Sequence, residues 1–149
     1  SVVQLSDDSL LMTLRTQLGG PYIARSKDRG KTWSKATFSG LEGGESGTCL
    51  RRLPGDSRVV LFWNNSKYEP KHHHFGERTP LTAAVSNDNG KTWRKLGNIA
   101  QNPKAEYTNL DCFFTKNGDA ILTYMYAEPA WNREAIHLKA ALIPKVWFK

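Results

Sequence analysis

The sequence predicts an all-β fold made of repeated antiparallel units, and three observations lead to this prediction. Short apolar segments alternate with turn residues along all 149 residues. No stretch keeps apolar residues at i, i+3 and i+4 for long enough to predict a helix. Two octapeptides 60 residues apart also share Ser, Asp, Gly, Lys, Thr and Trp at the same places, which indicates a repeat architecture.

The predicted strands are short and apolar, and turn sequences such as Gly19-Gly20-Pro21 and Pro54-Gly55-Asp56 separate them. Only the segment 135–141 has some helical character, and a strand is the better interpretation there. Strands are expected at 10–16, 21–26, 59–64, 81–86, 111–115, 120–126 and 136–143.

Composition and charge argue against several classes of protein. The 21 Lys and Arg against 14 Asp and Glu give a net charge of +7, but the basic residues are scattered and Arg51-Arg52 is their longest block. This pattern indicates a solvated surface and no nucleic-acid partner. No run of 18 apolar residues predicts a membrane span. Cys49 and Cys112 lie in apolar stretches as expected for buried thiols, and no cofactor or metal site is predicted.

The repeated octapeptide runs from Ser26 to Trp33 and again from Ser86 to Trp93. An Asp followed two residues later by Gly predicts a turn, in which the carboxylate accepts backbone N–H groups and Gly takes a positive φ. The Trp is expected to fill space between sheets. These residues are therefore predicted to be structural: Ser26, Asp28, Gly30, Thr32, Trp33, Ser86, Asp88, Gly90, Thr92 and Trp93.

The pattern Ser-x-Asp-x-Gly-x-Thr-Trp resembles the Asp box, or BNR repeat, of the sialidase (neuraminidase) superfamily of β-propellers. The resemblance implies a six-bladed propeller of four-stranded blades, with the box joining the third and fourth strands of a blade away from the active-site face. About three blades fit the chain, at 1–45, 46–103 and 104–149, as in the C-terminal half of that architecture. A homodimer that completes the propeller is one expected consequence.

The resemblance also implies a site for sialylated or other acidic glycans. In the family a Tyr nucleophile releases terminal sialic acid with retention, and arginines bind the substrate carboxylate through paired hydrogen bonds. By order and spacing, with gaps of 63 and 29 residues, Arg15 and Arg78 resemble two of these arginines and Tyr107 the nucleophile. The general base and acid would precede Ser1, so this stretch alone is expected to be inactive. Glu45 is a spare carboxylate, and Glu106 is not expected to be the base because neighbouring strand side chains point to opposite faces.

Two further motifs have weaker interpretations. The loop that contains His72-His73-His74 is expected to lie at the rim of the pocket, with metal binding as the lesser alternative. Asn64-Asn65-Ser66 is a glycosylation sequon that arises often by chance. The resemblance favours a secreted or periplasmic protein, although no signal peptide is visible at Ser1.

Three alternatives stay open from the sequence. The chain could belong to a non-catalytic propeller that binds glycans, because a fold does not fix a function. It could belong to a glycosidase or lyase of different sugar specificity on the same scaffold. It could also be an interaction module, in which case substitution of Arg78 would leave ligand binding unchanged.

Overall fold

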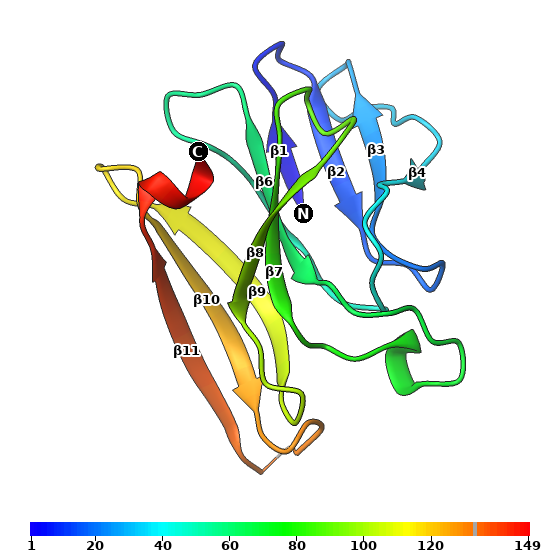
Figure 1. Ribbon diagram of the computed structural model, residues 1–149. Coiled ribbons are helices and arrows are strands. Elements are labelled where there is room, and N and C mark those ends of the chain that lie inside the picture. The colour runs from blue at the N-terminus through cyan, green and yellow to red at the C-terminus, as the bar shows by residue number, and fades with distance from the viewer. Residues whose placement is uncertain (133) are drawn as a thin grey trace.

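The computed structural model describes residues 1–132 and 134–149, and these residues form three antiparallel sheets that lie side by side (Figure 1). The first sheet contains β1 (Val2–Gln4), β2 (Leu10–Leu14), β3 (Tyr22–Ser26) and β4 (Thr37–Phe38). The second contains β5 (Cys49–Arg52), β6 (Val59–Asn64), β7 (Leu81–Ser86) and β8 (Arg94–Ala100). The third contains β9 (Glu106–Phe114), β10 (Ala120–Ala127) and β11 (Ile136–Ile143). Two short 3-10 turns are η1 (His73–Phe75) and η2 (Lys145–Phe148).

The second sheet is packed on both faces, which explains why its two central strands are apolar almost throughout. Every residue of β6 and β7 is buried. Successive side chains of a strand point to opposite faces. Leu61 and Trp63 accordingly belong to the apolar cluster shared with the first sheet, whereas Val60 and Phe62 belong to the cluster shared with the third. The three sheets are thus stacked as the blades of a propeller are stacked.

The all-β prediction is confirmed, and strands occur in all seven of the predicted places, including 136–143. The third sheet differs from the expected four-stranded blade, because the described residues give it three strands. Its first strand also begins at Glu106, earlier than the predicted 111–115. An irregularity in the pairing of β9 with β10 and a positive φ at Asn109 interrupt the alternation there, which concealed the first part of the strand from the sequence pattern.

Both octapeptides connect the third and fourth strands of their sheets, as predicted. In the second copy the Ser86 hydroxyl donates to Asp88 at 2.7 Å, and the Thr92 hydroxyl donates to the other carboxylate oxygen at 2.6 Å. Gly90 has a φ of +77°, and a Cβ on it would lie 2.5 Å from a methyl group of Leu11. These contacts show why the motif requires its Ser, Asp, Gly and Thr.

The two Asp-box carboxylates titrate at low pH because of these bonds. Hydrogen bonds from the side chain and the backbone N–H of Thr32 and from Ser26 lower the pKa of Asp28 to about 2. Partial burial acts to raise the pKa of Asp88, but hydrogen bonds from Thr92, Ser86 and a backbone N–H outweigh it and also bring that pKa to about 2. Both aspartates are therefore ionised turn residues at neutral pH.

The molecule has two distinct ends (Figure 1). The Asp-box connections β3–β4 and β7–β8 lie at the upper end of the view, and η1 and the β10–β11 connection lie at the lower end. The end of β2 and the starts of β7 and β9 lie at the ends of their sheets that are away from the Asp-box connections. In the described parts of the chain, no helix is long and apolar enough to span a bilayer.

Candidate functional site

All three residues predicted to form the site lie at or beside strand ends away from the Asp boxes. Arg15 follows β2 directly, Arg78 precedes β7, and Tyr107 is the second residue of β9. Each comes from a different sheet. The stacking of the three sheets therefore brings residues that are far apart in the sequence to one end of the molecule.

Arg15 contacts a carboxylate and an imidazole from two other segments. Its Nη2 lies 3.3 Å from Oε1 of Glu45 and 3.3 Å from Nδ1 of His74. Oε2 of Glu45 lies 3.4 Å from the same imidazole nitrogen. Desolvation, with the nearby Arg78, lowers the pKa of His74 below its usual value despite the contact with Glu45. The imidazole is therefore mainly neutral at pH 7.

Arg78 is buried and contacts residues of the third sheet. Its Nη1 lies 3.4 Å from Oε2 of Glu106, whose side chain is also buried. Its guanidinium carbon lies 4.9 Å from the ring centroid of Trp131, in the β10–β11 connection, which is cation–π distance. Trp131 in turn stacks on His74 with ring centroids 5.1 Å apart. A continuous series of contacts thus joins Arg15 to Arg78 through His74 and Trp131.

Tyr107 lies close to Arg78 through its backbone, and its ring is directed into the apolar cluster between the second and third sheets. Its N–H donates to the carbonyl of Arg78 at 3.0 Å. Its ring packs 5.7 Å from the rings of both Tyr124 and Tyr126 and is almost fully buried. Burial raises its pKa above the usual value for tyrosine. A proton acceptor would be needed before this phenol could act as a nucleophile.

Asn64, at the end of β6, holds the backbones of both residues. Its Nδ2 donates to the carbonyl of Arg78 at 2.9 Å and to the carbonyl of Tyr107 at 3.1 Å, and its Oδ1 accepts from the hydroxyl of Ser46. The side chain is only 1% exposed. The sequon at Asn64 is therefore closed to glycosylation in the folded protein, and its Asn has a structural role instead.

A second tyrosine at this end has a carboxylate partner. The hydroxyl of Tyr126 donates to Glu128, and Nδ2 of Asn102 lies 3.4 Å from the same hydroxyl. The hydrogen bond with Glu128 raises the pKa of Tyr126 and lowers the pKa of Glu128. The proton therefore stays on the tyrosine, and this pair does not by itself produce a phenolate.

The three consecutive histidines have different partners. Nε2 of His72 lies 3.0 Å from Glu77, and the ring of His73 lies 4.8 Å from the ring of Trp131. His74 contacts Arg15 and Glu45. Within residues 1–132 and 134–149, no three His, Cys, Asp or Glu side chains are grouped so as to hold a metal ion.

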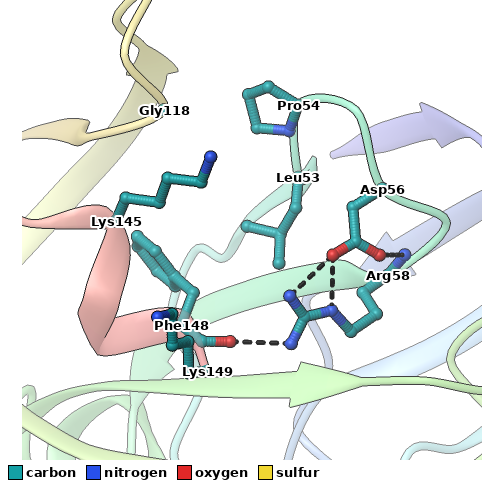
Figure 2. A pocket seen from close by; sticks show the side chains of 8 residues that line it. All are labelled: Leu53, Pro54, Asp56, Arg58, Gly118, Lys145, Phe148 and Lys149. Carbon is teal, nitrogen blue, oxygen red and sulfur yellow. Dashed lines mark hydrogen bonds and ion pairs between the residues drawn. The ribbon is translucent and has the colours of Figure 1, made fainter.

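A small cavity of about 100 Å³ lies at the opposite end of the molecule, where the β5–β6 and β9–β10 turns meet η2 (Figure 2). Among the basic residues that line it, Arg58 is bound to Asp56 and donates to the carbonyl of Phe148 at 2.8 Å. These contacts fix η2 against the second sheet. The cavity is far smaller than a typical ligand site and is separate from Arg15 and Arg78.

Sequence reasoning missed Trp131 and Asn64 and gave Glu45 and Glu106 no partner. The connections β2–β3, β6–β7 and β10–β11 occupy the same place in their sheets. An aromatic residue in the third of these loops could have been placed near His74 by that equivalence. The buried role of Asn64 has no comparable local signal, because its partners are distant in the sequence.

The three stacked sheets and the two Asp boxes are those of a sialidase-type β-propeller, of which this chain forms several blades. The sequence matches the model of the BNR repeat-like domain over residues 1–122. The chain therefore belongs to this family, within the sialidase and BNR superfamily. A comparison with curated protein sequences gave no match.

Several solved structures share this arrangement of strands. The leech intramolecular trans-sialidase is 20% identical with a TM-score of 0.71, and the match covers 99% of this chain and 23% of that one. The intramolecular trans-sialidase from Ruminococcus gnavus is 19% identical with a TM-score of 0.72, and the match covers 100% of this chain and 33% of that one. An α-L-arabinofuranosidase from Fusarium graminearum is 21% identical with a TM-score of 0.70, and the match covers 95% of this chain and 44% of that one. Identities this low show a shared fold, and the chain spans less than half of each of these structures.

Proposed function

We propose that this chain forms part of the substrate-binding face of a sialidase-like glycoside hydrolase that takes terminal sialic acid or a related acidic sugar. One observation carries the proposal. Arg15 and Arg78, from different sheets, are joined at one end of the molecule through His74 and Trp131. Cations and aromatic rings together suit a ligand that has both a carboxylate and a sugar ring.

Guanidinium groups are well suited to a sialic acid carboxylate, because their planar N–H groups match its two oxygens. Two structures with this fold agree with such a ligand class. The leech trans-sialidase is complexed with 2,7-anhydro-Neu5Ac, and the Ruminococcus gnavus trans-sialidase is complexed with oseltamivir carboxylate. These ligands belong to those proteins, and they support the proposal for this chain by analogy of fold.

In the whole protein we propose a retaining mechanism with Tyr107 as the nucleophile. A neutral phenol is not repelled by a substrate carboxylate, whereas a carboxylate nucleophile would be. Burial raises the pKa of Tyr107, so the mechanism needs a general base to remove its proton and an acid to protonate the leaving oxygen. We expect residues outside this stretch of chain to supply them.

Binding and turnover test the proposal separately. We expect calorimetric titration of the protein with the α-methyl glycoside of N-acetylneuraminic acid to show binding. A fluorogenic sialoside should be cleaved far more slowly than by a complete sialidase. Absence of binding would contradict the assignment of the sugar, and rapid cleavage would contradict the need for a further acid and base.

A neutral sugar is the second candidate, and one observation favours it. Each of the two arginines already faces a carboxylate, Arg15 that of Glu45 and Arg78 that of Glu106, which reduces the positive potential offered to an anion. The Fusarium graminearum protein of the same fold is an α-L-arabinofuranosidase. Binding of arabino-oligosaccharides without binding of sialic acid would select this candidate.

A further inference from the structure

His74, in the β6–β7 connection, contacts residues from three other segments of the chain. Its Nδ1 lies 3.3 Å from Nη2 of Arg15, after β2, and 3.4 Å from Oε2 of Glu45, between β4 and β5. Its ring stacks on Trp131, in the β10–β11 connection. Its backbone carbonyl accepts a hydrogen bond of 2.6 Å from the N–H of Glu45. This one residue therefore fastens the β6–β7 connection to the first sheet, to the β4–β5 segment and to the third sheet.

Nδ1 of His74 faces a donor and an acceptor, and its protonation state decides which of the two it bonds. A guanidinium only donates hydrogen bonds, and a carboxylate only accepts them. A bare Nδ1 therefore accepts from Arg15, whereas a protonated Nδ1 donates to Glu45. Glu45 already has an ion pair with Arg15 at 3.3 Å and accepts from Nε2 of Gln17 at 3.2 Å. Protonation thus ends the bond from Arg15 and offers His74 a carboxylate that is already occupied.

The charges around His74 favour its neutral form. The titratable and charged groups that face it in the described structure are Arg15, Arg78, Glu45 and His73, whose ring centroid lies 4.1 Å from that of His74. Desolvation, with Arg78, His73 and Arg15, lowers the pKa of His74, and the hydrogen bond with Glu45 only partly offsets this. Protons therefore favour any arrangement in which His74 has left this cluster.

The backbone at this point is held in an unfavourable conformation. His74 and Phe75 both have a φ of +57°, in the left-handed region that residues with a Cβ seldom adopt. Such a conformation persists only where surrounding contacts impose it. Within the connection, the N–H of Phe75 donates to His72 at 2.9 Å, and Nε2 of His72 lies 3.0 Å from Glu77. Release of the His74 side chain can therefore relieve strain and leave these internal contacts in place.

We propose that His74 is an acid-sensitive latch, which fastens the β6–β7 connection against Arg15, Glu45 and Trp131 while its imidazole is neutral and releases it when the imidazole is protonated. The pKa of His74 in the latched arrangement is below its ordinary value of 6.5. The latched arrangement is therefore fully favoured above pH 6.5 and loses its advantage as the pH falls through the lowered value. The proposal concerns the attachment of this connection, so it holds whatever ligand the candidate site binds.

Amide hydrogen exchange followed by NMR tests the latch, because the N–H of Glu45 is bonded to the carbonyl of His74. We expect the protection factor of this amide, corrected for the intrinsic effect of pH, to be constant above pH 6.5 and to fall below it. The fall should be about tenfold for each unit by which the pKa of His74, from the same titration, lies below 6.5. The amide of Gly118, bonded to Thr115 in the β9–β10 turn, should keep its protection.

Two matched variants assign the effect to a single imidazole. In His74→Gln, which cannot be protonated, the protection of the Glu45 amide should no longer depend on pH. In His72→Gln the dependence should remain, because His72 pairs with Glu77 inside the connection. The latch is overturned if the protection of Glu45 does not change with pH in the unsubstituted protein. It is also overturned if His74→Gln keeps the dependence, or if His72→Gln abolishes it.

Discussion

The side-chain amide of Asn64 donates a hydrogen bond of 2.9 Å to the backbone carbonyl of Arg78. The same nitrogen donates to Tyr107, so one buried group fixes the backbones of two residues of the candidate site. Asn64 lies at the end of β6 in the second sheet, and Tyr107 lies in β9 of the third. This amide therefore links the second sheet to the third at the end of the molecule where Arg15 and Arg78 are found.

We expect Asn64→Asp to destabilise the protein by about 2–4 kcal/mol, because a buried carboxylate would face two carbonyl oxygens and have no donor for them. Urea denaturation with and without the substitution measures the difference. Asn65→Asp is the matched control, since Asn65 Oδ1 already accepts from Lys95 near the surface. Equal stabilities of the two variants would contradict the structural role of Asn64.

Among the carboxylates at this end of the molecule, Glu106 is the one whose replacement by an uncharged residue is expected to lower the free energy of unfolding most. It is buried and pairs with Arg78, and removing one partner of a buried ion pair typically costs about 3–5 kcal/mol. We predict a loss of this size for Glu106→Gln in urea denaturation. Glu134→Gln, at an exposed position, should change stability by less than about 0.5 kcal/mol. A Glu106→Gln variant as stable as the control would show that the pair contributes nothing.

The Asp boxes predict a pH dependence of stability with a definite sign. The pKa of Asp88 is about 2 in the folded protein against 3.8 as its ordinary value, so its contribution is complete above about pH 4 and is lost as the pH falls towards 2. We expect Asp88→Asn to lower the melting temperature at pH 7, with a difference from the unsubstituted protein that shrinks between pH 4 and pH 2. Asp8→Asn, outside the boxes, is the control. If the difference in melting temperature stays constant between pH 4 and pH 2, the ionised carboxylate of Asp88 is not its cause.

Both thiols are predicted to be unreactive in the folded state. Burial raises the pKa of Cys49 to about 11 and that of Cys112 to about 12, so little thiolate exists at pH 8. We expect an aromatic disulfide reagent to label both thiols only as fast as the protein unfolds, with two equivalents released in denaturant. Rapid labelling of either thiol without denaturant would contradict this burial.

The outer face of the third sheet predicts self-association. Phe113, Ile121 and Leu142 form one cross-strand row, and Leu138 and Leu142 are 78% and 68% exposed. The first sheet, at the other side of the three, also exposes Val2 and Phe38. For the 149-residue chain by itself, we propose that two copies related by a two-fold axis cover these faces by pairing the third sheet of each with the first sheet of the other.

Light scattering after gel filtration tests this dimer. We expect a mass twice the 16.8 kDa of the chain, and a monomer for the variant with both Leu138→Lys and Leu142→Lys. His137→Lys, on the opposite face of the same strand, should leave the dimer intact. A mass of 16.8 kDa for the unsubstituted protein at all concentrations would contradict the proposal.

Local patterns predicted most of the strands because the interactions behind them are local. Val59–Asn64 and Leu81–Ser86 are apolar runs bounded by turn residues, and both were predicted to the residue. β9 was predicted five residues short, because the irregularity near Asn109 breaks the alternation that identifies a strand. Alternation along the strand predicted opposite faces for Glu106 and Tyr107, but it gave no sign that Glu106 would pair with Arg78.

The sequence by itself determined the repeat, the Asp-box turns and the all-β class, since Ser, Asp, Gly and Thr at fixed spacing form those turns from bonds within eight residues. Only the tertiary structure decided which side chains meet at the other end. The contacts of Arg15 with His74, of His74 with Trp131 and of Trp131 with Arg78 join loops from three sheets. Such contacts depend on how whole sheets stack, and stacking is set by the apolar clusters between them rather than by any local spacing.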